Sequence, residues 1–324
     1  MRVPGSVAWA FSIALMSLGA GVVSGQDFPT KPIRIVIPFA AGGGTDVIGR
    51  LLARKLSEAS SQQAVVDNRA GGGAIIGSEL VARSAPDGHT LLLTANPHTA
   101  NPALYAKLPY DTVRDFAPVT LVASAPLILV VHPSLPARTV KELIALATAR
   151  PGQLSYGTSG NGGPQHYAGE LFKHMTGINI IHVPYRGGAP ATIDLLAGHV
   201  QLAFNAMINA LPHLPGGRLR ALAVTSARRS DAAPEVPTVA ESSLKGFETT
   251  TWYGIFVAAG TPPAVIGKLN DGLIRALRQP DVAEILRKSG MSPVGNSPEA
   301  FGRFVVEEID RFRKVARDSG MRIE

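Results

Sequence analysis

The sequence of residues 33–46 is Ile-Arg-Ile-Val-Ile-Pro-Phe-Ala-Ala-Gly-Gly-Gly-Thr-Asp, and it joins a strand pattern to a helix pattern through three consecutive glycines. The β-branched run from Ile33 to Pro38 predicts a short buried strand. After the glycines, apolar residues recur along one face of a helix, at Val47, Ile48, Leu51, Leu52 and Leu56. A strand, a glycine loop and a helix in this order open a βαβ unit, so the segment predicts an α/β fold.

The rest of the chain continues the alternation of strands and helices. The other predicted strands are residues 90–94, 127–131, 154–158, 178–183, 200–205 and 219–225, with one more from Trp252. Helical patterns lie between them, one marked by a capping box of Thr139 and Glu142. Three further helices begin near Pro263, Pro280 and Pro298. This alternation favours parallel sheets with crossover helices.

The length of 324 residues exceeds the usual size of a single hydrophobic core, so we expect two lobes. The three C-terminal helices have no new strands to cover, and we expect them to pack on the first lobe. The chain would then cross between lobes near Ser124 and near Thr225, and two crossing strands would form a hinge. The predicted division is a signal peptide at 1–25, a first lobe of 26–124 plus 226–324, and a second lobe of 125–225.

The N-terminus predicts export to the periplasm. Arg2 is the only charged residue before Asp27, and an apolar stretch from Val7 to Val23 ends in the small residues Ser24 and Gly25. This layout is typical of a secretory signal peptide cleaved near Gly25. A membrane anchor is the alternative, but a spanning helix needs about 20 predominantly apolar residues. The sequence contains no cysteine, which excludes a lipid-attachment thiol, disulfides and thiolate chemistry.

The charge balance favours a small anionic ligand over a nucleic acid. The chain has 31 Lys and Arg against 24 Asp and Glu, a formal net charge of +7, which attracts anions at long range. The basic residues are scattered along predicted helices, as at Arg50 and Arg54, and show no interleaving with aromatic residues. That distribution is typical of a solvated face, so no nucleic-acid partner is expected.

Glycine-rich junctions between strands and helices are the sharpest candidates for a binding site. The first precedes the helix at Val47, and a second, Gly157 to Gly163, lies in the other lobe. Free backbone N–H groups at a helix N-terminus form an anion site, and ligands of open α/β sheets bind at the carboxyl ends of the strands. The alternative is that the glycines only make tight turns and that Thr45 or Asp46 caps the helix. A third junction, Pro184 to Gly188, carries Arg186, which could pair with a carboxylate.

The sequence gives little support to catalysis or to a cofactor. Ser159, His166 and Asp194 supply the residue types of a hydrolase triad, but Ser159 is not in a Gly-x-Ser-x-Gly elbow. The first glycine loop lacks the lysine of a phosphate-binding loop, and the eight histidines show no zinc-binding spacing. We therefore expect no metal, no cofactor and no enzymatic activity, with a periplasmic hydrolase as the rival hypothesis.

Motifs along the whole mature chain carry a resemblance to a known family. They include 28–39 (Phe-Pro-Thr-Lys-Pro-Ile-Arg-Ile-Val-Ile-Pro-Phe), 42–46, 68–72 (Asn-Arg-Ala-Gly-Gly), 85–88, 101–105, 115–118, 159–162, 182–185, 221–225, 237–239 and 260–263. In this order they resemble the Bug receptors, the TctC-like periplasmic binding components of tripartite tricarboxylate transporters. The resemblance implies a type II periplasmic-binding-protein fold with a carboxylated ligand between the lobes.

In the family, backbone amides, hydroxyls and waters at two glycine loops hold the carboxylate. On this sequence the implied ligand-binding residues are Phe39, Ala41, Gly43, Gly44, Thr45, Asp46, Thr158, Ser159, Gly160 and Asn161. Arg186 and Asn205 complete the predicted set. Relatives often carry aspartate at the position of Asn205, and the asparagine disfavours a ligand with an ammonium group.

The predicted function is capture of a small carboxylate in the periplasm for the permease subunits of a tripartite transporter. The ligand would be a di- or tricarboxylate, or an aromatic or amino-acid-like carboxylate. An alternative is a sensor whose closed form contacts a membrane histidine kinase. We expect a monomer.

Overall fold

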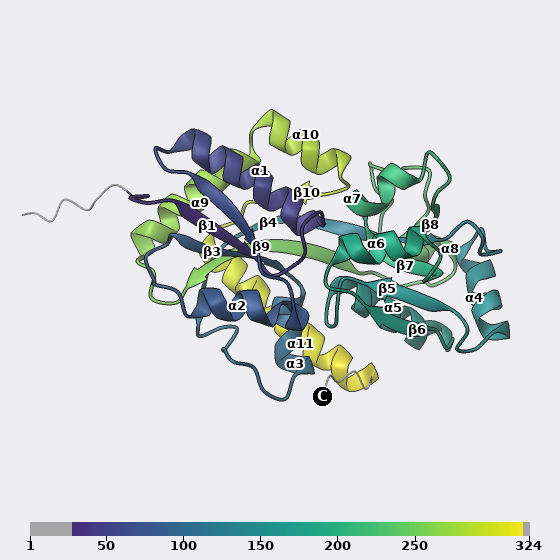
Figure 1. Cartoon of the computed structure of the whole chain (residues 1–324). Coiled ribbons are helices and arrows are strands. Elements are labelled where there is room, and N and C mark those ends of the chain that lie inside the picture. The colour runs from purple at the N-terminus through teal and green to yellow at the C-terminus, as the bar shows by residue number, and fades with distance from the viewer. Residues whose placement is uncertain (1–27, 320–324) are drawn as a thin grey trace, which may run out of the picture.

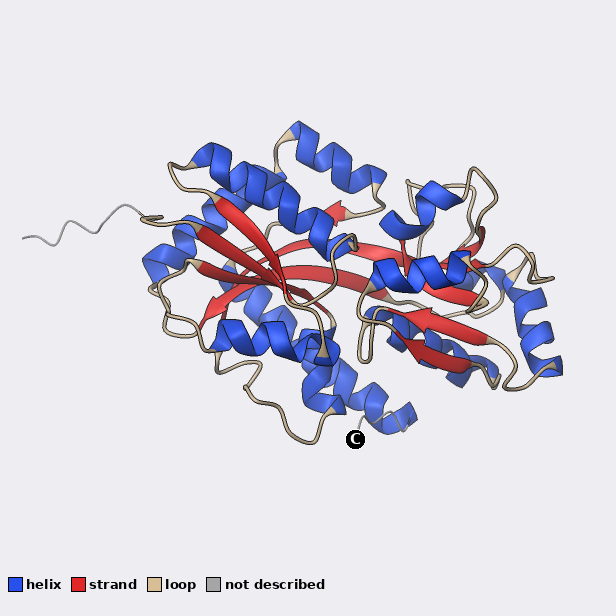
Figure 2. Cartoon of the chain, in the orientation of Figure 1, coloured by secondary structure: helices blue, strands red, loops and turns tan. Residues whose placement is uncertain are grey.

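The computed structural model describes residues 28–319, and the predicted signal peptide lies outside them. Two α/β halves lie side by side along one continuous mixed sheet (Figures 1 and 2). Within the described residues the strand order is β2-β1-β3-β9-β4-β7-β5-β6, and β8 and β10 also pair with β4. No helix of the described residues combines the length and the apolar character needed to span a membrane.

The first half contains the N-terminal strands and the C-terminal helices. Its strands are β1 (Ile33–Ile37), β2 (Ala64–Asn68), β3 (Thr90–Ala95), β9 (Thr250–Ala258), β10 (Ser292–Pro293) and the beginning of β4 (Phe116–Val131). Its helices are α1 (Gly44–Ala59), η1 (Gly72–Ala74), α2 (Ile75–Ala82), α3 (Pro97–Leu104), α9 (Pro263–Leu277), α10 (Pro280–Lys288) and α11 (Pro298–Ser319). Strands β1, β2 and β3 are parallel, whereas β9 is antiparallel to β3 and β4.

The second half is built from the middle of the chain. Its strands are the end of β4, β5 (Ser155–Thr158), β6 (Ile181–Pro184), β7 (Leu202–Ala206) and β8 (Arg220–Val224). Its helices are α4 (Val140–Ala149), α5 (Pro164–Thr176), α6 (Gly188–Leu196), α7 (Met207–Ala210), η2 (Leu211–His213) and α8 (Val239–Ser242). Strands β5, β6 and β7 are parallel, and β4 runs antiparallel to β7 and β8.

Each half buries apolar side chains on both faces of its part of the sheet. In the first half, Ile35 and Leu52 belong to one core cluster, and Trp252 and Phe301 belong to the cluster on the other face. The second half has its own pair of clusters, one of them centred on Phe172 and Phe204. The core clusters of the two halves are separate, and strand β4 is shared between the halves. This arrangement allows the halves to move relative to each other.

Most predicted elements are present, and the differences have physical causes. The helices predicted at Pro164, Pro263, Pro280 and Pro298 begin at those residues, and Thr139 caps α4 by accepting the N–H of Glu142 at 3.1 Å. The expected parallel pairing is present within each half, but β4 and β9 are antiparallel to their neighbours, so the sheet is mixed. Strand β2 and the first part of β4 were not predicted.

The point at which the chain returns to the first half differs from the sequence interpretation. Residues 226–249 were assigned to the first lobe, but Val239 and Phe247 lie in the core cluster of the second half. The return comes at β9, which pairs with β3 and β4. We therefore propose that the boundary between the lobes falls near Thr249 instead of Thr225, because side chains of the segment 226–249 pack in the second half.

Candidate functional site

A small, partly open cavity lies between the two halves, with a volume of about 50 Å³. Its lining residues are Phe39, Gly43, Gly44, Thr45, Ala95, Pro97, Leu127, Ser159, Pro164, Gln165, Gly188, Ala206, Asn209, Thr251 and Tyr253. This volume is well below the roughly 300–1,000 Å³ typical of small-molecule pockets. The two halves therefore lie close together at the site and leave less room than a dicarboxylate needs.

Helix N-termini converge on the cavity from both halves. Helices α1, α3, α5 and α6 begin beside it, and in the described residues no side chain caps the first turn from their N-cap positions Gly43, Asn96, Gly163 and Gly187. The first N–H groups of a helix have no partner within the helix and carry the positive end of its dipole. The cavity is consequently suited to an anion.

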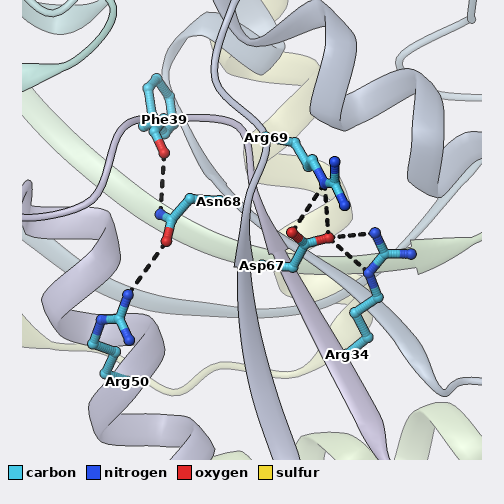
Figure 3. A network of polar contacts seen from close by, with 6 residues as sticks. All are labelled: Arg34, Phe39, Arg50, Asp67, Asn68 and Arg69. Carbon is cyan, nitrogen blue, oxygen red and sulfur yellow. Dashed lines mark hydrogen bonds and ion pairs between the residues drawn. The ribbon is translucent and has the colours of Figure 1, made fainter.

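The first glycine loop is held by a network of polar contacts with β2 and α1 (Figure 3). Asn68 donates to the carbonyl of Phe39 at 3.1 Å, and Arg50 donates to Asn68 at 3.4 Å. Arg50 also donates to Asp46 at 3.0 Å, and Asp46 accepts the N–H of Gly42 at 3.0 Å. Burial raises the pKa of Asp46, but the hydrogen bonds from Arg50 and Gly42 outweigh it and lower the pKa. Asp46 is therefore ionised and shapes the loop.

A second ion-pair group in the same network joins the strands below the loop. Asp67 on β2 accepts hydrogen bonds from Arg34 on β1, at 2.8 Å from Nε, and from Arg69, at 3.0 Å (Figure 3). These bonds lower the pKa of the Asp67 carboxyl although burial opposes them. The group stabilises the pairing of β1 and β2 from which the loop emerges.

The second glycine loop rests on two stacked, neutral histidines. Thr158 Oγ1 lies 2.7 Å from His182 Nε2, and His166 Nδ1 accepts the N–H of Gly162 at 3.2 Å. The rings of His166 and His182 stack with centroids 4.0 Å apart. Burial lowers the pKa of His166, and it lowers the pKa of His182 to about 3. These histidines support the loop from behind and do not line the cavity.

Gln165 links the second loop to the end of β7. Its Oε1 accepts the N–H of Ser159, and its Nε2 donates to Asn205 Oδ1 at 3.5 Å. Asn205 also donates from Nδ2 to Thr192 at 2.9 Å. Asn205 therefore orients Gln165 and is not itself among the lining residues.

Tyr253 contributes a hydroxyl from the first half. A Cβ atom on Gly44 would lie 2.8 Å from this hydroxyl, so the hydroxyl packs against the first residue of α1. Burial raises the pKa of Tyr253 to about 12, which keeps it protonated as a hydrogen-bond donor. The absence of a side chain at Gly44 is what allows this close approach.

The structure brings together part of the predicted set. The predicted residues that line the cavity are Phe39, Gly43, Gly44, Thr45 and Ser159. The predicted residues that do not line it are Ala41, Asp46, Thr158, Gly160, Asn161, Arg186 and Asn205. Arg186 is exposed, and its carbonyl accepts the N–H of Ala40 from the other half at 3.2 Å. Its contribution here is thus a backbone contact between the two halves.

Sequence reasoning missed two groups of lining residues. The first group lies in or beside the recognised glycine junctions and consists of Pro164, Gln165 and Gly188. Their position next to these junctions could have predicted that they line the cavity. Thr251 and Tyr253 on β9, Asn209 on α7, and the apolar residues at the strand ends carry no local motif. They reach the cavity only through the tertiary fold.

The residues that line the cavity are of the kinds found in a ligand-binding site. None of the described residues that line the cavity is charged. Ser159, His166 and Asp194 form no triad, because His166 accepts from Gly162 and Asp194 accepts from the hydroxyl of Tyr185 at 2.6 Å. Within residues 28–319, no group of three or more His, Asp or Glu side chains is placed to hold a metal.

Comparison with known proteins identifies the family. The model of the tripartite tricarboxylate transporter family receptor matches residues 48–321. The chain belongs to this receptor family. The receptor is 38% identical to the protein BugT of Bordetella pertussis over 307 residues, 94% of each chain. The predicted resemblance to the Bug receptors is thereby confirmed.

Two solved relatives of the receptor contain carboxylates. A Rhodopseudomonas palustris protein solved with adipate has 38% identity and a TM-score of 0.89, over 92% of this chain and 100% of its own. MatC from Rhodopseudomonas palustris, with bound malate, has 32% identity and a TM-score of 0.85, over 89% and 99%. The receptor therefore has the predicted type II periplasmic-binding-protein fold. It is a solute-binding protein and not an enzyme.

Proposed function

We propose that this receptor binds a small aliphatic dicarboxylate, of the size of malate or adipate, between its two halves. The observation that carries the proposal is an uncharged cavity onto which helix N-termini converge from both halves. The relatives solved with adipate and with malate support the same ligand class. Halves that part and close again would admit such a ligand.

The character of the lining also bears on which ligands are rejected. Backbone N–H groups and the amides of Gln165 and Asn209 donate hydrogen bonds, which suits a carboxylate. An ammonium group would need a carboxylate or several acceptors, and no lining residue among those described is an acid. An amino-acid ligand is thus disfavoured relative to a plain dicarboxylate.

The proposal extends to the transport role. The loaded, closed receptor would present its ligand to the permease subunits of a tripartite transporter at the periplasmic face of the membrane. The family match supports this role, and a signal peptide at residues 1–25 would deliver the protein there. Presentation of the closed form to a sensor kinase stays a prediction from the sequence.

Binding is tested by calorimetry with protein freed of any retained ligand by unfolding and refolding. Adipate or malate should bind, whereas the diamide of adipic acid should not. Gly43→Asp should abolish binding, because it places a carboxylate at the first helix N-terminus. The backbone accepts a side chain there, since a Cβ would lie no closer than 3.8 Å to its neighbours.

The matched control is Gly216→Asp, at an exposed glycine whose Cβ would also be free of close contacts. This variant should bind like the wild type. Wild-type affinity in a folded Gly43→Asp protein, or equal affinity for the acid and its diamide, would refute the proposed site.

A further inference from the structure

Asn209 places an unused hydrogen-bond donor at the cavity. It lies on the short helix α7 and lines the cavity, and its Nδ2 is buried without a hydrogen-bond partner among the described residues. A buried amide donor left unpaired costs about 1–3 kcal/mol, so such groups usually have a partner in the functional state. The missing partner is expected to be an acceptor that enters the cavity.

Two further donors lie beside this amide. A Cβ atom built on Gly188, the first residue of α6, would lie 2.6 Å from Asn209 Nδ2 and 4.0 Å from Gln165 Nε2. The Asn209 amide therefore packs directly against the N-terminal backbone of α6. The N–H of Gly188 is one of the first-turn groups that have no partner within the helix.

The orientation of Gln165 is fixed by its neighbours. Its oxygen is occupied by the N–H of Ser159, so its nitrogen faces Asn205 Oδ1. That oxygen also accepts the N–H of Ala206 at 2.9 Å. The bond from Gln165 Nε2 to Asn205 uses one of the two amide protons, and the second has no hydrogen-bond partner among residues 28–319, so it can serve a ligand.

We propose that Asn209 Nδ2, Gln165 Nε2 and the N–H of Gly188 form a donor cluster that binds one ionised carboxylate of the ligand. This inference rests on the proposed function, and it names the residues that select the ligand. All three donors belong to the second half of the molecule. The cluster can consequently form without closure of the two halves.

Replacement of Asn209 tests the cluster with adipate and malate as the probes. Asn209→Ala should weaken the binding of whichever acid binds the wild type by about tenfold to a hundredfold, because it removes one hydrogen bond to a charged group. Asn179→Ala, at an exposed asparagine of the same half, is the matched control and should bind normally. Equal affinity of the two variants would overturn the proposal.

Gly188→Ala separates binding from stability. Gly188 begins a helix, and the atom that the new methyl group meets is the flexible end of a side chain, so the variant should fold with little change in stability. The new methyl group displaces the Asn209 amide, the flexible end of a side chain, and binding should fall at least tenfold. Unchanged binding in this variant would contradict a cluster built around Gly188.

A ligand-free readout distinguishes failure of this inference from failure of the proposed function. Asn209→Asp places a carboxylate inside the donor cluster, so NMR titration should find the pKa of the new carboxyl group below the ordinary value of about 3.9. A raised pKa would overturn the cluster. If the pKa is lowered and the wild type binds neither acid, the cluster stands and the dicarboxylate assignment fails.

Discussion

His98 is fully buried in the first half, on α3. Neither of its ring nitrogens has a hydrogen-bond partner among the described residues, and the ring packs against Phe116 and Phe256 with centroids 4.7 and 4.5 Å away. Burial lowers the pKa of His98 to about 3, so the ring is neutral at physiological pH. Like His182 beneath the second glycine loop, it must gain a proton when the protein unfolds in mild acid.

The prediction at this scale is an acid sensitivity that His98→Leu reduces. The pKa of His98 in the folded protein lies below the unfolded value of about 6.5. The contribution of neutral His98 to the free energy of unfolding is therefore fully present above about pH 6.5 and is lost as the pH falls toward 3. By pH 5 the loss from His98 is about 2 kcal/mol. Urea unfolding at pH 7 and pH 5 should show a smaller difference for His98→Leu than for the wild type.

The exposed His174 provides the control for this experiment. His174→Leu should retain the pH dependence of the wild type. If His98→Leu loses as much stability as the wild type between pH 7 and pH 5, the assignment of the sensitivity to His98 is wrong.

At the scale of elements, the loop before α1 obtains its shape from residues outside it. Asp46, in the first turn of α1, accepts from Gly42 and Arg50 and leaves the amides at the helix N-terminus to the cavity. Asn68, at the end of β2, fixes the carbonyl of Phe39. The helix N-terminus thus stays available to the proposed anion, because the acidic residue of its first turn is engaged elsewhere.

Asn68→Ala should weaken ligand binding about twofold to tenfold, because it removes one neutral hydrogen bond of about 0.5–1.5 kcal/mol from the loop. The hydrogen bonds of Asn68 to the Phe39 carbonyl and from Arg50 lie within the protein and involve no ligand. Calorimetry with adipate or malate measures the effect. Asn179→Ala again serves as the control, and an affinity equal to that of the control would show that the loop holds its shape without Asn68.

For the whole molecule, the two passages of the chain between the halves are tied together at Thr225. Its hydroxyl accepts the N–H of Leu127 on β4 at 2.8 Å and donates to the carbonyl of Thr249 at 2.7 Å. The edges of the halves also touch, through the bond from Ala40 to Arg186 and through rings of Tyr167 and Phe312 with centroids 5.3 Å apart. We propose that the Thr225 connection is the hinge and that the edge contacts stabilise the closed form.

Tyr167→Ala should shift the ligand-free protein toward an open form. The lost ring contact is worth about 0.5–1.5 kcal/mol, so affinity should fall about twofold to tenfold. Small-angle scattering should show a smaller radius of gyration on ligand addition for the wild type, and a larger ligand-free radius for the variant. Val306→Ala, at an exposed residue of α11, is the control.

A radius of gyration that is unchanged by saturating ligand, with binding shown independently, would refute closure about a hinge. A ligand-free radius of Tyr167→Ala equal to that of the control would show that this ring contact does not stabilise the closed form.

The sequence alone determined the α/β class, the helix starts at proline and the family. It also located the glycine junctions, of which Phe39, Gly43, Gly44, Thr45 and Ser159 line the cavity. These features depend on backbone preferences and hydrogen bonds between residues close in the chain, which a local pattern records. Glycine, proline and the apolar spacing of a helix act over only a few residues.

Only the tertiary structure decided which other residues meet at the cavity. Tyr253 packs against Gly44, and Asn209 against Gly188, because β9 and α7 are placed by the order of strands in the sheet. The same packing places Val239 and Phe247 in the core of the second half. Contacts between distant segments depend on how whole elements pack, and no short pattern in the sequence encodes that packing.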